Sequence, residues 1–333
     1  MKKLIQWGVK ALIAGIGAVM ILSVFCIFYT NDGIHVASDT GATDYVWESG
    51  QLKSTMKEGF SWIRMDSYGY NNVFDYSKEP DILLMGSSHM EAAQISKKEN
   101  VGYLLNTLLP DYHTYNIGVS GHTIYRCMDN LENALETYQP QKYVVMVVDT
   151  VELEHDLMME VIEETATPIP SYDSGFIYYL QKIPAIKVIY KQLDDWISMD
   201  GWANSLISHA KEKKDELKYQ NTLSVFLRDA ASLAEEADLT LMIVYQPEQM
   251  LKTDGTLSYG YSETMLQSFR MECEKQGIVF CDMTEGFQTL YEEEHILAHG
   301  FANSELGEGH LNKYGHAVIA ETIVAKIQEL EAE

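Results

Sequence analysis

The sequence predicts an α/β domain with a doubly wound, parallel sheet, preceded by a single membrane-spanning helix. From residue 81 onward, short and almost wholly apolar runs alternate with longer amphipathic segments. Such runs are typical of strands buried on both faces, and strands that alternate with helices of this length form right-handed crossovers in a parallel sheet. With 333 residues, 46% of them hydrophobic, the chain can also bury a sizeable core.

Five strands and five helices are expected in this region. The strand-like runs are residues 81–86, 114–118, 143–149, 239–245 and 278–283. The helical patterns are residues 101–109, 124–138, 223–236 and 263–275, and a last helix in which Ile319, Ile323 and Ile327 stand four residues apart. Gly277 follows the fourth of these helices as a normal helix stop.

Two segments lack this alternation. Residues 31–80 show no clear periodicity, and we interpret them as a spacer whose later, aromatic part (residues 60–76) packs on the domain as a lead-in. Residues 152–220 interrupt the rhythm after the third strand with prolines, an aromatic-rich run and a charged helix. We expect this segment to be an insertion or lid over one edge of the sheet, within a domain that covers residues 81–333.

Residues 11–30 are expected to form a transmembrane signal anchor. Residues 11–29 carry no charge, close to the ~20 residues that a helix needs to cross a bilayer. Three lysines precede them and none follows closely, so residues 1–10 would be a cytoplasmic stub and the rest would lie outside. A cleaved signal peptide is the alternative, but its apolar region is usually about 7–15 residues. A lipoprotein cleaved before Cys26 is disfavoured by Phe25, where a small residue is expected. The sequence therefore predicts a single-pass protein of a cell membrane.

Composition excludes some classes of function. The formal net charge is −25, and the first thirty residues hold only three charged groups, all lysines. So acidic a domain is a poor nucleic-acid binder, because phosphate neutralisation needs clustered Lys and Arg. It would also repel anionic polymers unless cations intervene. The four cysteines form neither a zinc-binding nor a disulfide pattern, so free and mostly buried thiols are expected.

The turn after the first strand carries the first candidate catalytic group. Gly86 permits a sharp turn, and Ser87 and Ser88 fall where a helix would begin and present its unpaired N–H groups. A hydroxyl placed there meets donors that could hold an oxyanion. The alternative is that Ser88 is simply an N-capping serine, because serine is among the commonest N-caps.

Serine chemistry also needs a base and further donors near the same edge of the sheet. His310 lies on a glycine-flanked loop just before the last helix and is the candidate base; it could instead cap or pack against that helix. Gly121, after the second strand, would let backbone approach a reacting carbonyl, although an ordinary strand-to-helix turn also favours glycine. His316 falls inside the last helix and is expected to be structural.

Three short motifs resemble blocks of the SGNH/GDSL hydrolase superfamily. They are residues 86–88 (Gly-Ser-Ser), 116–123 (Asn-Ile-Gly-Val-Ser-Gly-His-Thr) and 309–312 (Gly-His-Leu-Asn). They match the first, second and fifth blocks in order, over about residues 81–330. The resemblance implies a flavodoxin-like, five-stranded sheet and ester or acyl-transfer chemistry without a cofactor. By matching positions it assigns Ser88 as nucleophile, the N–H groups of Ser88 and Gly121 as oxyanion donors, and His310 as general base.

Two positions depart from the family pattern. Where the family usually has an Asp, three residues before the histidine, this chain has Gly307; Glu308 could orient the imidazole instead, or the site could work as a Ser–His dyad. In the third block the family's oxyanion Asn is replaced by Val151, and Thr150 is the candidate substitute.

The remaining candidates are two histidines and a set of partners. His89 and His122 each follow a motif residue, where they could contact substrate or simply begin their helices. No ligand spacing predicts a metal site. Ser87 before the nucleophile, the signal anchor and the insertion after the third strand together resemble a branch of the family, the membrane-tethered proteins of bacterial cell envelopes. These proteins accompany membrane-bound O-acyltransferases and modify teichoic acids or exopolysaccharides. This likeness implies an acylated polysaccharide or teichoic-acid-like polymer as substrate.

We therefore expect an extracytoplasmic serine esterase or O-acyltransferase. The competing hypothesis is a catalytically silent module that binds glycan or scaffolds an envelope complex, which the missing Asn and displaced acid favour. A phosphate-binding flavodoxin-like protein fits less well, because Gly86-Ser87-Ser88 is too short for a phosphate loop and lacks its lysine.

Overall fold

The computed structural model describes residues 2–29, 33–56, 58–153, 179–180, 182–189, 216–260 and 263–332. Within these residues, a five-stranded parallel sheet forms the centre of the domain, in the order β11-β8-β7-β5-β6. Its strands are β5 (Ile82–Gly86), β6 (Thr114–Asn116), β7 (Tyr143–Asp149), β8 (Thr240–Gln246) and β11 (Val279–Asp282). Numbered along the chain, the spatial order is 2-1-3-4-5, the flavodoxin-like order. The predicted fold class is confirmed.

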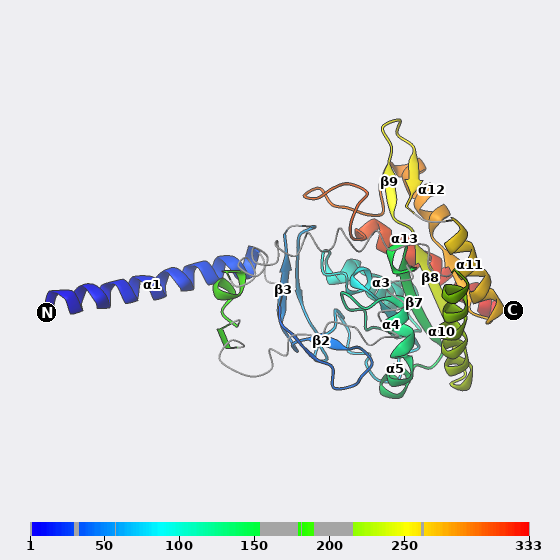
Figure 1. Ribbon diagram of the computed structural model, residues 1–333, viewed down its shortest axis with the longest axis horizontal. Helices are drawn as coiled ribbons and strands as arrows, with labels where there is room; N and C mark the ends of the chain where they lie inside the picture. Colours follow the sequence, from blue (N-terminus) through cyan, green and yellow to red (C-terminus); the bar gives the residue numbers. More distant parts are fainter. Residues whose placement is uncertain are drawn as a thin grey trace.

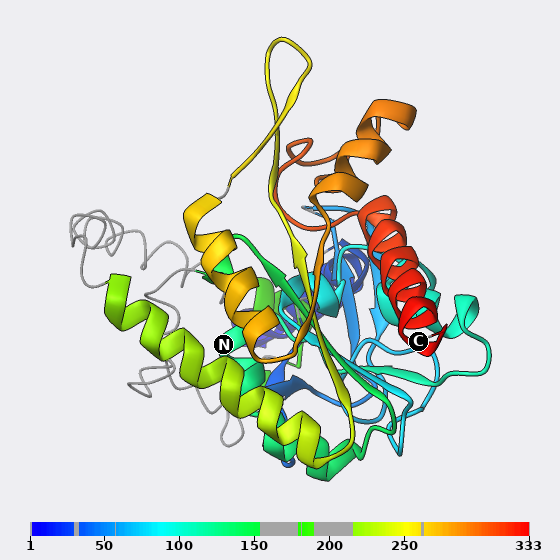
Figure 2. The ribbon, with the colours of Figure 1, turned by 90° about the vertical axis from the view of Figure 1, so that its right-hand side faces the viewer.

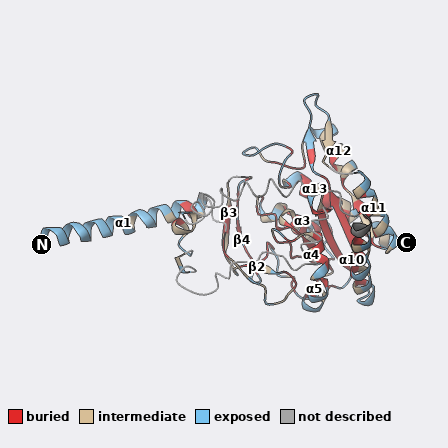
Figure 3. Ribbon diagram, viewed as in Figure 1, coloured by how far each residue is buried: buried red, intermediate tan, exposed pale blue. Residues whose placement is uncertain are grey.

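Helices cover both faces of this sheet, so the domain has three layers (Figure 2). One face carries α4 (Ile124–Asp129), α5 (Leu131–Tyr138), α10 (Glu216–Glu236) and α11 (Glu263–Lys275). The other carries α3 (Val101–Leu108), α12 (Thr284–Glu294) and α13 (Lys313–Ala332). Side chains of β5 alternate between the two: Leu83 and Met85 join the first core, and Ile82 and Leu84 the second. Figure 3 shows the central strands as the most buried part of the molecule.

Some elements differ from the expected ones. The helix expected over residues 124–138 is two helices, because Asn130 ends α4 and leads into α5. A hairpin of β9 (Gln249–Leu251) and β10 (Leu257–Tyr259), and helix α12, were not predicted. Most of the insertion at residues 152–220 lies outside the described residues, as do residues 209–215 of the expected charged helix, whose last three residues belong to α10. The four cysteines are all described and are free and buried, as predicted.

The N-terminal helix α1 (Lys2–Tyr29) extends away from the domain as a separate rod (Figure 1). It has a mean hydropathy of 2.7 over its most apolar stretch, and among the described residues it is the helix long and apolar enough to cross a membrane. A membrane anchor and a signal sequence share this appearance.

The first part of the segment after α1 is not the spacer that we expected, whereas its later, aromatic part does pack on the domain. The segment folds into two antiparallel hairpins, β1 (His35–Ala37) with β2 (Tyr45–Trp47) and β3 (Leu52–Thr55) with β4 (Ser61–Arg64). The β3–β4 hairpin lies against the short helix α2 (Ser88–Glu91) and its following loop: Lys53 pairs with Glu91, and Ser61 donates a hydrogen bond to the Ala93 carbonyl. The domain therefore begins well before residue 81, and this hairpin is part of the candidate site.

Candidate active site

Ser88 is the first residue of α2, at the carboxyl end of the central strand β5. Gly86 makes the turn with φ of +154°, where a Cβ would lie 2.9 Å from the Val147 carbonyl oxygen, so the turn requires glycine. Ser87, not Ser88, occupies the N-cap position. The N–H of Ser88 is thus one of the first donors of the helix, which have no intrahelical partner. The interpretation of Ser88 as an N-capping serine does not hold.

The loop that holds Gly121 is fastened to α2 and to the turn before it. The Val119 N–H donates to the Gly86 carbonyl at 3.0 Å. The Asn116 side chain donates to the Met90 carbonyl at 2.7 Å and accepts from the Gly118 N–H at 2.8 Å. Two of the motifs identified in the sequence are therefore joined through their backbones at one edge of the sheet.

The buried ion pair of Lys53 and Glu91 also holds the loop that carries Gly121. Glu91 is 1% exposed and pairs with Lys53, and its second oxygen accepts the Ser120 N–H at 2.8 Å. Burial raises the pKa of Glu91, but Lys53 and the Ser120 N–H outweigh it, and the net pKa is lowered. Gly121 has φ of +85°, and a Cβ there would lie 2.7 Å from the Tyr45 hydroxyl. The positive φ at position 121 therefore favours glycine.

His310 is held by Glu58 through two hydrogen bonds. The His310 Nδ1 lies 2.6 Å from Glu58 Oε2, and the His310 backbone N–H donates to Oε1 at 2.6 Å. Burial raises the pKa of Glu58, but the two hydrogen bonds from His310 lower it and outweigh burial. The net pKa therefore lies below the ordinary value. A Cβ on Gly309 would lie 2.3 Å from Glu58 Oε1, so this double contact depends on glycine before the histidine.

The expectation that Glu308 orients His310 is wrong in this structure. Glu308 is exposed, and a hydrogen bond with Glu305 raises its pKa. Glu58 is 252 residues away from His310 in sequence, in a segment without periodicity. The sequence around Glu58 gave no local signal for this role, because Glu58 is an isolated acid between two short strands that the sequence did not predict.

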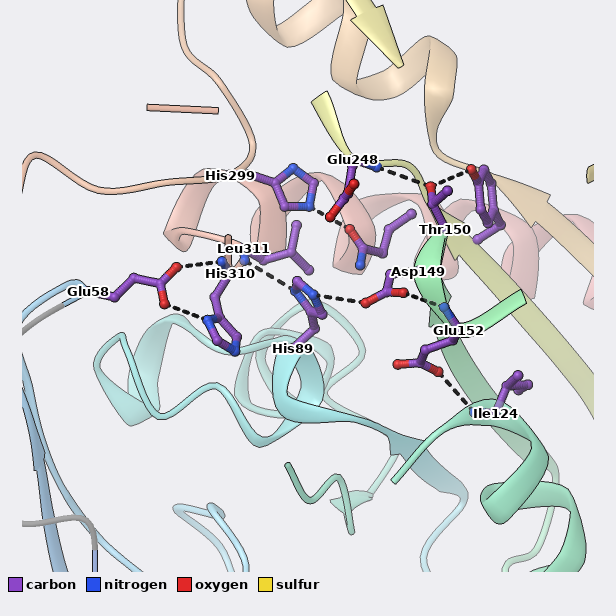
Figure 4. A network of polar contacts seen from close by, with 12 residues as sticks. Glu58, His89, Ile124, Asp149, Thr150, Glu152, Glu248, His299, His310 and Leu311 are labelled. Carbon is purple, nitrogen blue, oxygen red and sulfur yellow. Dashed lines mark hydrogen bonds and ion pairs between the residues drawn. The ribbon is translucent and has the colours of Figure 1, made fainter. Parts of the chain in front are cut away.

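His89 joins the two motif loops. Its Nδ1 accepts the Leu311 N–H at 3.2 Å, so Nε2 carries the proton and faces Asp149 Oδ2 at 3.2 Å. Its ring centroid lies 5.2 Å from that of His310. Figure 4 shows this series of contacts, from Glu58 and His310 across His89 to Asp149. Since the residue after Ser88 contacts the residue after His310, the segments that carry the predicted nucleophile and base are neighbours.

Asp149 and Glu152 form an acidic pair at the end of β7. Burial raises the pKa of Asp149, but His89 and the N–H groups of Glu152 and Val151 give a net lowering. Glu152 shows the opposite: burial and then the neighbouring Asp149 raise its pKa well above the ordinary value. Its Oε2 accepts the Ile124 N–H at 2.9 Å. Glu152 Oε1 has no partner among the described residues. Sequence reasoning missed Glu152 as a buried acid.

Two further candidates are engaged elsewhere. His122 is 2% exposed, its Nε2 accepts the Asp44 N–H at 3.0 Å, and burial lowers its pKa to about 4. It does not lie at the mouth of the site. The Thr150 hydroxyl lies 2.8 Å from the Tyr245 hydroxyl, and Val151, at the position of the family's oxyanion Asn, has an apolar side chain that cannot donate. Val151 therefore supplies no side-chain donor.

A cavity of about 510 Å³ lies beside the His310 loop. Its size falls within the roughly 300–1,000 Å³ of small-molecule sites. One wall is the strand-like pairing of residues 298–300 with 310–312, in which the Gly300 N–H donates to the His310 carbonyl at 3.0 Å. Its larger apolar lining residues are Phe60, Ile95, Ile296, Leu297, Phe301, Leu306 and Tyr314.

No protein-family model and no curated protein matches the sequence. Solved structures do. The protein TesA is 12% identical with a TM-score of 0.40, covering 75% of this chain and 98% of its own. An acetyl xylan esterase is 12% identical with a TM-score of 0.41, covering 74% and 98%. A member of the lipolytic G-D-S-L family from Veillonella parvula is 13% identical with a TM-score of 0.40, covering 73% and 96%. At this level of likeness, the activity of the chain rests on its own site.

Proposed function

We propose that the chain is a membrane-anchored serine esterase or O-acyltransferase that acts outside the cytoplasm on acyl esters of a cell-envelope glycan or glycopolymer. The observation that carries this proposal is the Glu58–His310 pair beside the turn of Ser88. A nucleophile, a base held in one orientation by a carboxylate, and backbone donors are the parts that acyl transfer needs.

In this reaction the Ser88 hydroxyl attacks the ester carbonyl carbon, and His310 Nε2 takes its proton. Glu58 on Nδ1 fixes the tautomer that leaves Nε2 as acceptor and stabilises the imidazolium. The N–H groups of Ser88 and Gly121 hold the oxyanion, a class of contact worth about 2.7–4 kcal/mol per donor. The intermediate collapses as His310 returns the proton to the leaving alcohol. Water or a sugar hydroxyl then attacks the acyl-serine, giving hydrolysis or transfer.

Helix α1 supports a location outside the cytoplasm, and the acidic surface of the domain bears on which polymer it acts on. A helix of this hydropathy next to three lysines fits a signal anchor that leaves the domain outside. The net charge of −25 disfavours an anionic teichoic-acid-like polymer unless cations intervene, so an acylated polysaccharide fits the domain better. A membrane-bound O-acyltransferase is the partner that would supply acyl groups if the reaction is transfer.

The test is labelling of the full chain, purified in detergent, with a fluorophosphonate probe. We expect wild-type protein to be labelled at Ser88, and Ser88→Ala and His310→Ala to lose the label. Folding of all three is checked by circular dichroism. A folded wild-type chain that resists the probe, in detergent and in native membranes, would instead favour the catalytically silent glycan-binding or scaffolding module.

A further inference from the structure

We propose that the outer face of strand β4 is a membrane-docking surface that holds the catalytic domain against the phospholipid headgroups. This inference rests on the proposed anchor. Side chains alternate along residues 60–64: Ser61 and Ile63 are buried against the domain, whereas Phe60, Trp62 and Arg64 point outward. Phe60 is 64% exposed and Trp62 51% exposed. The domain thus presents two large aromatic rings and a guanidinium on one face of a two-stranded hairpin.

This outer face is continuous with the end of α1. The Trp62 indole N–H donates to the Phe28 carbonyl at 2.9 Å, and the Phe28 and Trp62 rings meet edge to face with centroids 5.3 Å apart. The Phe60 ring follows, with its centroid 5.5 Å from that of Trp62. Figure 1 shows the β3–β4 hairpin standing across the end of α1, between the helix and the central sheet. A bilayer that surrounds α1 would therefore lie on the side of this hairpin that faces away from the central sheet, where the described part of residues 179–189 also stands.

The chemistry of the face fits the interfacial region of a bilayer. Trp prefers this region because its ring is apolar while its N–H can remain hydrogen-bonded. Arg64, on the same face, donates to the Gly50 carbonyl at 2.8 Å through one guanidinium nitrogen, and the rest of this group can reach lipid phosphates. Elsewhere the acidic surface of the domain would be repelled by anionic headgroups. Docking through the aromatic face keeps that acidic surface in water.

The same hairpin reaches the active site from its other side. Lys53 on its inner face pairs with Glu91 of α2, and Glu58, in the connection between its strands, holds His310. Phe60 also lines the cavity beside the His310 loop. Docking would place the opening of the site at the lipid surface, so the acyl ester it receives is one presented there, on a membrane lipid or on a polymer still attached to one.

The test uses the full chain in phosphatidylcholine nanodiscs, with and without acyl chains brominated near the headgroup, and tryptophan emission as the readout. Three variants isolate single tryptophans by difference from wild type: Trp62→Phe, Trp47→Phe and Trp7→Phe. Trp47 is 5% exposed within the domain and serves as the matched control, and Trp7 reports on α1 itself. We expect brominated lipid to quench the Trp62 and Trp7 emission and to leave the Trp47 emission unchanged.

The outcomes separate this inference from the anchor beneath it. One outcome would overturn the docking surface and leave the anchor intact. In it, brominated lipid quenches Trp7 but not Trp62, and aqueous acrylamide quenches Trp62. Unquenched Trp7 would overturn the anchor and the docking surface together. Trp62 protected from both quenchers would show that a second copy or another protein covers the face, which also overturns the proposal.

Discussion

The double contact between Glu58 and His310 fixes two things at once. The bond to Nδ1 sets the tautomer and the ring orientation, and the bond to the backbone N–H sets the position of the loop. A serine-type site needs the correct tautomer and the correct loop position, because a base displaced beyond hydrogen-bond distance no longer takes the proton of the hydroxyl. Gly309 leaves room for the carboxylate, so an adjacent glycine and histidine and an acid far away in sequence specify one geometry.

Replacing the carboxylate should therefore reduce turnover while the fold survives. We expect Glu58→Gln to lower kcat by about 10²- to 10⁴-fold, the usual contribution of general acid–base catalysis, because an amide no longer stabilises the imidazolium. Glu308→Gln is the matched control and should leave kcat unchanged. Rates of fluorophosphonate labelling and of ester hydrolysis measure both. Equal losses in the two variants, or none in Glu58→Gln, would contradict the assignment.

Glu152 offers a prediction about pH. Its raised pKa means that the folded state keeps a proton which the unfolded state loses, so stability falls as pH rises from the unfolded pKa of about 4.3 to the folded pKa. Glu152→Gln keeps an acceptor for the Ile124 N–H and removes this dependence. We expect the free energy of unfolding of Glu152→Gln, relative to that of the wild type, to increase by about 1.4 kcal/mol for each pH unit between these two pKa values.

Urea unfolding between pH 2 and 8 measures this difference, and Glu58→Gln supplies the opposite sign at the acid end of the range. The lowered pKa of Glu58 gives stability that is present above its unfolded pKa and is lost as pH falls through the folded one. The Glu58→Gln deficit should therefore shrink toward acid pH. A Glu152→Gln advantage that stays constant with pH would mean that Glu152 is ionised when folded.

Among the elements, the β3–β4 hairpin and α2 depend on each other. The Lys53–Glu91 pair is almost fully buried, with side chains 10% and 1% exposed, and Glu91 also holds the Ser120 N–H of the oxyanion loop. Breaking a buried pair leaves a charge without a partner, which costs far more than the pair itself contributes. The pair thus couples the hairpin, the nucleophile helix and the donor loop.

A double-mutant cycle tests this coupling. We expect Lys53→Met to lose about 3–5 kcal/mol of unfolding free energy, because Glu91 stays charged in the interior. Adding Glu91→Gln should recover part of the loss, since the amide is neutral and still accepts the Ser120 N–H. Chemical denaturation of the two single variants and the double variant measures the coupling. If the double variant is as unstable as Lys53→Met, the loss comes from packing of the lysine stem instead.

The sequence predicted the strong elements of the fold and missed the weak ones, for a physical reason. Strands β5, β7 and β8 are continuous apolar runs because both faces are covered, and this pattern is local. Strands β3 and β4 have only four residues each, and their buried positions include the polar residues Lys53, Ser54 and Ser61, so no apolar pattern marks them in the sequence. Ser88, Gly121 and His310 lie on motifs next to strong elements, whereas Glu58 lies on the hairpin and was missed with it.

At the scale of the whole molecule, residues 33–80 complete the domain instead of leading up to it. Asn72 exchanges two hydrogen bonds with the backbone of Asn116 on the edge strand β6, at 3.0 and 2.8 Å. This contact covers an edge that would otherwise be open to pairing with other chains. Tyr70 is 1% exposed and belongs to the core beneath the sheet. The segment thus supplies an edge cover, a core residue and the acid of the site.

Two truncations separate this view from the expected domain of residues 81–333. A chain that begins at Gly33 lacks only α1 and its connection, so we expect a cooperative thermal transition and fluorophosphonate labelling like that of the full chain. A chain that begins at Asp81 loses Glu58, Lys53 and the Asn72 contacts. We expect it to melt without cooperativity, to aggregate through β6, and to resist the probe. Thermal melts followed by circular dichroism, and fluorophosphonate labelling of both truncated chains, show whether residues 33–80 are part of the folded domain. A folded, labelled chain from Asp81 would mean that neither the hairpin nor Glu58 is required, and the Ser–His dyad would then account for the chemistry.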